Sequence, residues 1–367
     1  MKIGIITQPL RGNYGGLLQN YALQEILIQL GHQPITLELM SIRSGLKNII
    51  YQINNFTKYI FGKSPYPILP YAPYRSNIKI KKFVKDHINT SNTLLNSFPM
   101  QLIKKLDLGA IIVGSDQVWR PKYNASLTDM YLKFCHDKKV RKIAYAASFG
   151  TSEFEYNEVQ CQECANLLSK FHSVSVREKT GLNILRKLNF RHGVQVLDPT
   201  LLLGKAGFDK LLLDNINTTE EPYLGCYVLD NDEKLNDIIQ IISVNNNLYK
   251  IKRFGENTYG FGPLEWITAI KNAQLFVTDS FHGTVFCLLY HVPFFSFINS
   301  NRGADRFLSL LEPLGLLDRL ISDISDCDKR YSHIDWNKVD NTLNNYRNNS
   351  LSFLKNSLQT FPKLSTK

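Results

Sequence analysis

The first forty residues decide the fold class. They open with KIGIIT at residues 2–7, an apolar run of strand length, and continue through QPLRGNYGG at 8–16, a loop with three glycines. Residues 17–30 then repeat apolar side chains at helical spacing, Gly31 ends that helix, and 34–39 form a second apolar run. A strand, a glycine-bearing loop, a helix and a strand make a βαβ unit, which normally builds a parallel sheet.

The same alternation of strands and helices continues along the chain. Further strands are predicted at residues 110–113, 143–147, 174–176, 194–197, 223–229, 248–253, 275–278 and 294–297. Helices are predicted at residues 156–171, 179–188, 233–244, 264–272, 284–290 and 335–358. A polar stretch at 213–222, which ends in proline, interrupts the series and is the predicted linker.

We therefore expect an α/β protein with two Rossmann-like, doubly wound domains that face each other across a cleft. The first domain spans residues 1–213 and the second spans 222–334, and a C-terminal helix within 335–367 packs back across both. Open α/β sheets bind ligands beyond the carboxyl ends of their strands. Functional side chains should therefore lie just after the predicted strands.

Most of the excess positive charge lies in one segment. The chain has 367 residues, of which 44% are hydrophobic and 20% charged, so a packed core is expected and wholesale disorder is excluded. Lys and Arg number 43 against 32 Asp and Glu, a net charge of +11. Nine of these cations lie within residues 39–85, where there is no acidic residue. A protein that coats nucleic acid would be basic more evenly.

The cysteines and the apolar runs indicate a cytoplasmic protein. Six cysteines are scattered along the chain, which fits reduced thiols, and the CxxC at 161–164 has no second pair at zinc-site spacing. The N-terminal apolar run is too short for the core of a signal peptide. The longest apolar run, 285–298, is shorter than the roughly 20 residues that a membrane-spanning helix needs.

Small and charged residues follow two predicted strands of the first domain. Strand 110–113 runs into Ser115 and Asp116. Asp116 is either a helix cap or a base that activates an acceptor hydroxyl, and the spacing alone favours the cap. Strand 174–176 delivers Arg177, which either clamps a phosphate or carboxylate or pairs at the surface with Glu178 or Glu158. Its position at a strand end favours the clamp.

The strongest local signal is TDSFHGT at residues 278–284, where a buried strand meets an apolar helix. Ser280 or Asp279 is expected to cap that helix. His282 then lies at the positive end of the helix, where free N–H groups favour an anion. Histidine also transfers protons near neutral pH. The sequence therefore predicts a functional histidine at this turn.

A set of motifs in this order is typical of one protein family. The set consists of GNYGG at 12–16 with Gln19, GSDQVW at 114–119, ASFG at 147–150, SVRE at 175–178, LDPT at 197–200, TDSFHGT at 278–284 and PF at 293–294. Together these motifs resemble the polysaccharide pyruvyl transferase family over nearly the whole chain. Many members carry an aspartate where this chain has Gly16. Because of this difference, the resemblance does not identify the acceptor sugar.

The resemblance implies a fold similar to the two-domain GT-B glycosyltransferases, with an acceptor-side N-terminal domain and a donor-side C-terminal domain. Family members transfer the pyruvyl group of phosphoenolpyruvate onto two hydroxyls of a sugar in a polysaccharide or lipid-linked precursor. The reaction forms a cyclic ketal and releases phosphate. By resemblance, Arg177 and His282 contact phosphoenolpyruvate, and no metal or organic cofactor is implied.

These expectations assign a role to each candidate residue. We expect His282 to act as the acid and Asp116 as the base. The donor is expected to contact Arg177, Ser280, His282, Gly283 and Thr284. The acceptor is expected to contact Asn13, Tyr14, Gly15, Gln19, Ser115 and Trp119. Further anion contacts are expected from the cations Arg302 and Arg306, for which a helix ion pair is the alternative.

Two other classes of function stay open. A GT-B glycosyltransferase that uses a nucleotide-sugar needs a carboxylate for the ribose, and Glu265 is the candidate. A non-enzymatic protein would bind nucleic acid or a partner through the basic insertion at about 43–85, whose aromatic side chains are suited to stacking on bases. We favour an acceptor-side or membrane-surface role for this insertion, at the inner face of the membrane, because saccharide acceptors are often lipid-linked and that leaflet is anionic. No nucleic acid is then expected as a partner.

Overall fold

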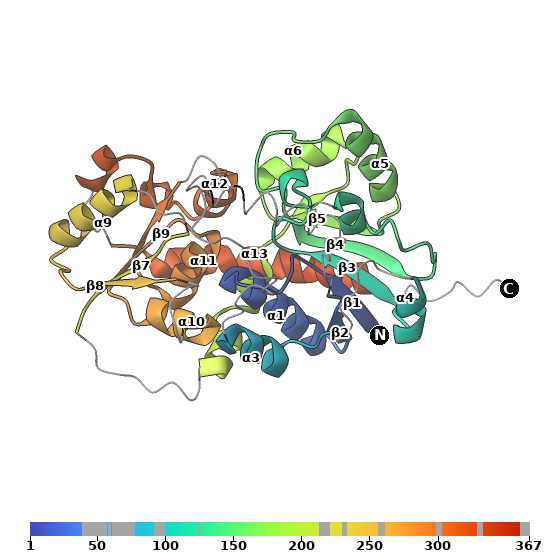
Figure 1. The fold of residues 1–367 in the computed structure, drawn as a ribbon, viewed down its shortest axis with the longest axis horizontal. Coiled ribbons are helices and arrows are strands. Elements are labelled where there is room, and N and C mark those ends of the chain that lie inside the picture. Colours follow the sequence, from blue (N-terminus) through green and yellow to red (C-terminus); the bar gives the residue numbers. More distant parts are fainter. Residues whose placement is uncertain are drawn as a thin grey trace.

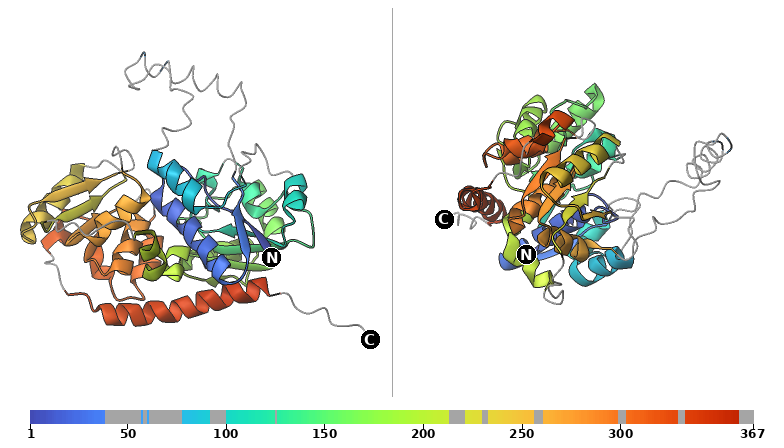
Figure 2. Two further views of the ribbon diagram at one scale, coloured as in Figure 1. Left: turned by 90° about the horizontal axis from the view of Figure 1, so that it is seen from below. Right: turned by 90° about the vertical axis from the view of Figure 1, so that its left-hand side faces the viewer.

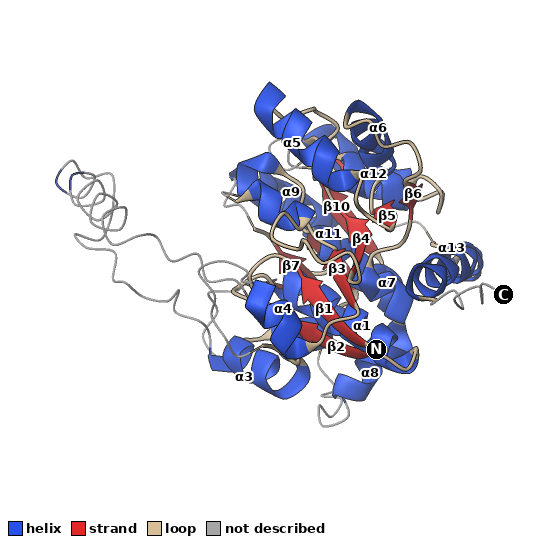
Figure 3. Cartoon of the chain, turned by 90° about the vertical axis from the view of Figure 1, so that its right-hand side faces the viewer, coloured by secondary structure: helices blue, strands red, loops and turns tan. Residues whose placement is uncertain are grey.

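The chain folds around two parallel β-sheets. A computed structural model describes residues 1–38, 57, 60, 78–91, 100–124, 126–212, 221–229, 233–255, 261–298, 303–328 and 333–359. In these residues each sheet is parallel throughout and is flanked by helices (Figure 1). The helices lie on both sides of the strands (Figure 3). The α/β fold class expected from the sequence is confirmed.

The first sheet has six strands in the order β2-β1-β3-β4-β5-β6. They are β1 (Lys2–Ile6), β2 (Gln33–Thr36), β3 (Ala110–Gly114), β4 (Arg141–Ala147), β5 (Ser173–Val176) and β6 (Val194–Gln195). The central strand β3 is buried along its whole length, as expected for a parallel strand covered by helices on both faces. Strands β1 and β2 pair in parallel and are joined by α1 (Tyr14–Gln29), which confirms the βαβ unit predicted for the first forty residues.

The remaining helices of this half are mostly short. They are α3 (Ile78–His87), α4 (Met100–Leu106), α5 (Glu158–Leu168), α6 (Lys179–Lys187), α7 (Pro199–Leu203) and α8 (Lys205–Asp209). Helices α5 and α6 were predicted from their periodicity. The other four were not, because their segments are too short or too polar to show a helical period.

The second sheet has five strands in the order β11-β10-β9-β7-β8. They are β7 (Leu224–Tyr227), β8 (Ile251–Phe254), β9 (Leu275–Thr278), β10 (Phe294–Phe297) and β11 (Leu320–Ile321). Helices α9 (Glu233–Asn245), α10 (Pro263–Lys271), α11 (Phe281–Tyr290) and α12 (Asp305–Leu311) connect or cover them. Strand β11 has only two residues and was not predicted from the sequence.

One hydrophobic cluster and one long helix connect the two sheets. The cluster contains Tyr14 of α1 together with Tyr227 and Trp266 of the second sheet and its helices. Helix α13 (Trp336–Leu358) runs along both halves of the molecule (Figure 2). Its Ser350 hydroxyl accepts the backbone N–H of Leu197 at 2.9 Å, and its Trp336 ring stacks on His291 at 4.8 Å. Side chains from both halves and from α13 therefore hold the two halves of the molecule together.

Several predictions concern residues outside the described part of the chain. The basic insertion at about 43–85 is described only at 57, 60 and 78–85, and the linker 213–222 only at 221 and 222. Arg302 also lies outside the described residues. No helix among the residues that are described is long and apolar enough to cross a membrane.

Candidate functional site

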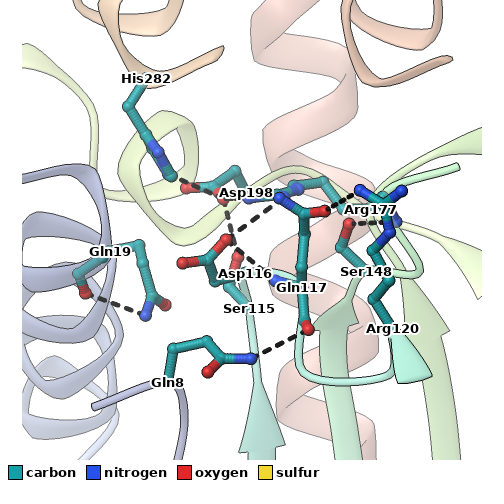
Figure 4. A network of polar contacts seen from close by, with 12 residues as sticks. Gln8, Gln19, Ser115, Asp116, Gln117, Arg120, Ser148, Arg177, Asp198 and His282 are labelled. Atoms are coloured by element: carbon teal, nitrogen blue, oxygen red, sulfur yellow. Dashed lines mark hydrogen bonds and ion pairs between the residues drawn. The ribbon is translucent and has the colours of Figure 1, made fainter. Parts of the chain in front are cut away.

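The carboxyl ends of the two sheets meet at one cluster of buried polar side chains. Strands β3 and β5 of the first sheet and β9 of the second all point toward it. Arg177 follows β5 and His282 lies in the first turn of α11, directly after β9. Both approach the carboxylate of Asp198 (Figure 4). The rule that placed candidate residues at strand ends therefore brings Arg177 and His282 together.

Asp198 lies at the centre of the cluster. Its Oδ2 atom accepts hydrogen bonds from Arg177 Nη1 at 2.9 Å and Ser115 Oγ at 2.7 Å, and lies 3.5 Å from His282 Nε2. Its Oδ1 atom caps α7 by accepting the backbone N–H of Thr200 at 3.0 Å and its hydroxyl at 2.7 Å. Burial alone would raise the pKa of Asp198, but His282, Arg177 and the Thr200 hydroxyl outweigh it and hold that pKa well below its usual range.

Arg177 is buried among carboxylates, with its side chain 2% exposed. Its Nη2 atom lies 3.9 Å from Asp116 Oδ1, and its Nε atom lies 4.0 Å from Glu178 Oε2. Burial would lower the pKa of this guanidinium, but Asp198, Asp116 and Glu178 reverse the effect and raise it. Both distances are too long for hydrogen bonds, and within the described part of the chain neither Nε nor Nη2 has a hydrogen-bond partner. The Nε and Nη2 edge of the guanidinium therefore keeps two unused N–H donors, the arrangement that binds an anion with two parallel hydrogen bonds.

A second buried arginine comes from the other half of the molecule. Arg306 of α12 lies 5.9 Å from the centre of the Phe281 ring, and Arg177 lies 4.5 Å from the centre of the same ring. Burial, followed by repulsion from Arg177, lowers the pKa of Arg306 to about 10. Two guanidinium groups, one from each half of the molecule, thus lie within cation–π distance of the same Phe281 ring. A bound anion between the halves would offset their repulsion.

The turn after β3 is strained where it delivers Asp116. Ser115 and Asp116 have positive φ angles of 25° and 62°, which side chains other than glycine rarely adopt. Strain of this kind often occurs at functional sites. Asp116 Oδ1 accepts the N–H of Gln117 at 2.9 Å within this turn, and no helix starts there. The cap that the spacing favoured for Asp116 is therefore wrong, because the chain turns into a tight loop instead of a helix.

Glu178 is a buried residue that the sequence analysis did not place at the site. Its side chain is 0% exposed, so the surface pair with Arg177, considered above as an alternative, is wrong. Its Oε1 atom accepts the Ser148 hydroxyl at 3.0 Å and the backbone N–H groups of Phe149 and Gly150 at 2.7 and 3.1 Å. It therefore fixes the loop after β4. Asp198 was also missed as a site residue, because an aspartate before Pro-Thr has the pattern of an ordinary helix cap.

The N-termini of α1 and α11 face each other across the site. Asn13 caps α1 by accepting the N–H of Gly16 at 3.1 Å, and Ser280 caps α11 by accepting the N–H of Gly283 at 3.3 Å. The imidazole of His282 packs directly on Gly15, where a Cβ atom would lie only 2.1 Å from Nδ1. Because Gly15 has no side chain, His282 of the second half can pack directly against α1 of the first half.

Three of the predicted acceptor contacts face the protein interior instead. Tyr14 donates its hydroxyl to the carbonyl of Phe261 at 3.2 Å, and Gln19 donates its side-chain N–H to Thr7 Oγ1 at 2.8 Å. Trp119 stacks on Tyr131 at 4.9 Å. All three predicted contacts are 0% exposed. Tyr14 and Trp119 belong to the hydrophobic clusters of the core, whereas Gln19 is buried among polar contacts with Thr7 and the Gly16 carbonyl.

The other predicted contacts divide between the site and its support. Asn13 is exposed, and its Nδ2 atom lies 3.4 Å from Asp116 Oδ2. Ser115 is fully buried and orients Asp198. Thr284 is also fully buried, and its hydroxyl is 2.5 Å from the hydroxyl of Ser296, so it supports α11 and does not face the site. Gly283 packs against Thr278, which leaves no room for a Cβ atom there.

The sequence also shows to which family the chain belongs. Residues 13–301 match the model of the family described as polysaccharide pyruvyl transferase. The chain belongs to the polysaccharide pyruvyl transferase family. The matched range contains every residue that contacts Asp198 in the site. No match was found among curated proteins.

Solved structures show which fold this pyruvyl transferase family member has. UDP-GlcNAc 2-epimerase from Neisseria meningitidis, solved with UDP-GlcNAc, superposes with a TM-score of 0.51 at 9% identity, covering 98% of this chain and 99% of that one. The Rickettsia bellii UDP-N-acetylglucosamine 2-epimerase gives 0.51 at 10% identity, with 96% of each chain covered. A variant of TarM from S. aureus gives 0.50 at 10% identity, covering 98% and 100%. The expected GT-B fold is confirmed.

The contact between Gly15 and His282 gives a test of the site in this pyruvyl transferase family member. In Gly15→Ala the new methyl group must displace the imidazole, and a misplacement of about 1 Å costs about 100-fold in activity. Gly16→Ala is the matched control, because its Cβ atom meets nothing closer than 3.4 Å. We expect steady-state activity to fall in Gly15→Ala and to change by less than about tenfold in Gly16→Ala, with similar melting temperatures. Equal losses in both variants would contradict the packing argument.

Proposed function

We propose that this protein transfers the pyruvyl group of phosphoenolpyruvate onto two hydroxyls of a sugar in a polysaccharide or lipid-linked oligosaccharide precursor. The product is a cyclic ketal, and inorganic phosphate is released. The observation that carries the proposal is the free Nε and Nη2 edge of buried Arg177, next to His282 and Arg306 where the two sheets meet. Family membership supports the same reaction class.

The donor suits the charges of the site. Phosphoenolpyruvate carries a phosphate and a carboxylate, and the free edge of Arg177 is shaped for either one. Arg306 and the N-terminus of α11 supply further positive potential from the other half. Two buried arginines face the three buried carboxylates of Asp116, Asp198 and Glu178.

The proposed chemistry begins with proton transfer from His282 to the methylene carbon of the donor. The electron pair of the double bond forms the new C–H bond and leaves the carbon that bears the phosphate cationic. The first acceptor hydroxyl attacks that carbon and gives its proton to Asp116, whose carboxylate lies at the edge of the site near exposed Asn13. The second hydroxyl then displaces phosphate, which takes up the proton of that hydroxyl as it leaves, and the ketal closes. Return of the first hydroxyl's proton from Asp116 to His282 restores the starting state. None of these steps requires a metal or an organic cofactor.

The acceptor is proposed to approach from the N-terminal half. Asn13 is exposed and lies next to Asp116, the proposed base, whereas Tyr14, Gln19 and Trp119 are fully buried. A lipid-linked sugar would reach them at the inner face of a membrane. The basic insertion at about 43–85 would then lie toward the anionic leaflet.

The test measures phosphate release from phosphoenolpyruvate with a panel of lipid-linked and nucleotide-linked sugars. We expect release that depends on one acceptor, together with a product whose mass corresponds to the acceptor carrying one pyruvyl ketal. Binding of phosphoenolpyruvate and of UDP-GlcNAc is compared by calorimetry. Saturable binding of a nucleotide-sugar without any binding of phosphoenolpyruvate would overturn the proposal in favour of a nucleotide-sugar transferase. The carboxylate suggested for that alternative, Glu265, forms an ion pair with Lys79 of α3.

A further inference from the structure

The carboxylate of Asp198 contacts both residues that we assign to the donor. An ordinary helix cap needs one carboxylate oxygen, and Oδ1 of Asp198 fills that role with Thr200. The second oxygen, Oδ2, accepts Ser115 Oγ and Arg177 Nη1 and faces His282 Nε2. Because Oδ1 is fixed by the turn into α7, the direction of Oδ2 is fixed as well. Asp198 is fully buried, so water does not compete for it.

Positive groups surround His282 except on one side. The N-terminus of α11, Arg177 and Arg306 are all positive and lie close to it or to the neighbouring Phe281 ring. Among the described residues, Asp198 is the carboxylate within ion-pair distance of the imidazole. Asp116 and Glu178 lie 3.9 and 4.0 Å from the guanidinium of Arg177 instead. Asp198 is therefore the carboxylate that orients the imidazole.

The two ring nitrogens of His282 face different surroundings. Nε2 is buried and faces Asp198 Oδ2 at 3.5 Å, with no hydrogen bond to any described residue. Nδ1 lies next to Gly15 at the N-terminus of α1, and no described residue forms a hydrogen bond with it either. A buried acceptor at Nε2 selects the form with the proton on that nitrogen. The second proton of an imidazolium would then be on Nδ1.

We propose that Asp198 is a positioning residue that accepts the Nε2–H of His282 and holds Arg177 by Nη1. It thereby leaves Nδ1 as the nitrogen that meets the donor and keeps the Nε and Nη2 edge of Arg177 open. This inference rests on the proposed function. In the transfer step the Nδ1–H bond breaks and the C–H bond of the donor's methyl group forms. The Nε2–H bond stays with Asp198, which does not become protonated.

The first test compares kcat, KM and the melting temperature of Asp198→Asn with those of the wild-type enzyme. At neutral pH kcat should fall by about 100-fold or more. The matched control is Asp335→Asn, which alters the cap of α13 through Lys338 but touches no site residue.

The second test reads the position of the proton without using activity. A long-range ¹H–¹⁵N spectrum of histidine-labelled protein, with His282→Asn for assignment, should show neutral His282 protonated on Nε2. Ser115→Ala removes the hydroxyl that orients Asp198, so in that variant we expect the preference for Nε2 to weaken. The Ser115→Ala variant still tests the proposal if Asp198→Asn does not fold.

The outcomes separate the two proposals. Wild-type His282 protonated on Nδ1, or a kcat that Asp198→Asn leaves within about tenfold of the wild-type value, overturns the positioning role even where phosphate is released. Absence of phosphate release with every acceptor overturns the proposed function, while the spectrum still tests the geometry. A merely structural Asp198 would lower the melting temperature and leave the proton position unchanged.

Discussion

Replacing His282 by asparagine is expected to lower kcat for pyruvyl transfer by about 10²–10⁴-fold, the range typical of the loss of a general acid. Asparagine keeps a polar side chain of similar length but has no group that delivers a proton near neutral pH. The site is buried and its other groups are fixed by hydrogen bonds, so water cannot readily take over. The measurement is steady-state phosphate release at saturating donor and acceptor.

His291→Asn is the matched control for this prediction. His291 follows the last residue of α11, the helix that carries His282 in its first turn, and its ring contacts Asp340 and Trp336 of α13. Its side chain is 42% exposed and far from the cluster around Asp198 along the helix. We expect kcat to stay within about twofold in His291→Asn, with at most a small loss of stability. A His282→Asn enzyme that keeps more than about a tenth of kcat would contradict the acid role.

The sequence predicted the fold well because its signals are local. The helical spacing of residues 17–30, the glycine after it and the short apolar runs each depend on neighbouring residues, and α1, β3 and β9 follow them closely. Strand order could not be predicted in the same way. That β7 lies between β9 and β8 depends on packing between distant segments, which no local period reports.

The residues of the candidate site that were predicted are those to which a rule about sheet topology applies. Arg177 and His282 were placed by the rule that ligands bind at the carboxyl ends of parallel strands, and the structure brings them to one carboxylate. Tyr14 and Trp119 were placed only by their nearness to a motif, and both point into the core. The direction of a side chain after a loop depends on tertiary packing. Spacing alone therefore could not separate these residues from the site.

The buried carboxylates were missed for a different reason. Asp198 begins an ordinary capped turn and Glu178 follows an arginine, and both patterns are common at protein surfaces. Only the fold shows that both are buried next to Arg177. Buried charges are costly unless paired, so their role in the site becomes visible only after their burial is known.

Replacing Arg177 by glutamine is expected to give the largest loss of stability among the site variants, about 3–5 kcal/mol. The change leaves Asp198 without its ion pair and removes the nearest cation from Asp116 and Glu178. Arg177→Lys keeps the charge but loses the planar edge that would bind an anion through two hydrogen bonds. We therefore expect the lysine variant to fold and to bind phosphoenolpyruvate at least tenfold more weakly. Urea denaturation measures the first effect and calorimetry the second.

The destabilisation in Arg177→Gln should depend on pH in a definite direction. In the wild-type protein the pKa of Asp198 is depressed, so its ion pairs contribute stability above the unfolded pKa near 3.8, and that contribution is lost only as pH falls through the much lower folded value. Without Arg177, the pKa of Asp198 rises because burial is then opposed only by His282 and the Thr200 hydroxyl, so the carboxyl takes up a proton at higher pH than in the wild-type protein. The gap in unfolding free energy between the two proteins should therefore be largest at neutral pH and shrink as pH approaches 4. Arg186→Gln, a change on α6 at an exposed arginine that contacts Asn183, serves as the control and should show no such trend. A gap that stays constant or widens on acidification would show that Arg177 does not stabilise the ionised form of Asp198.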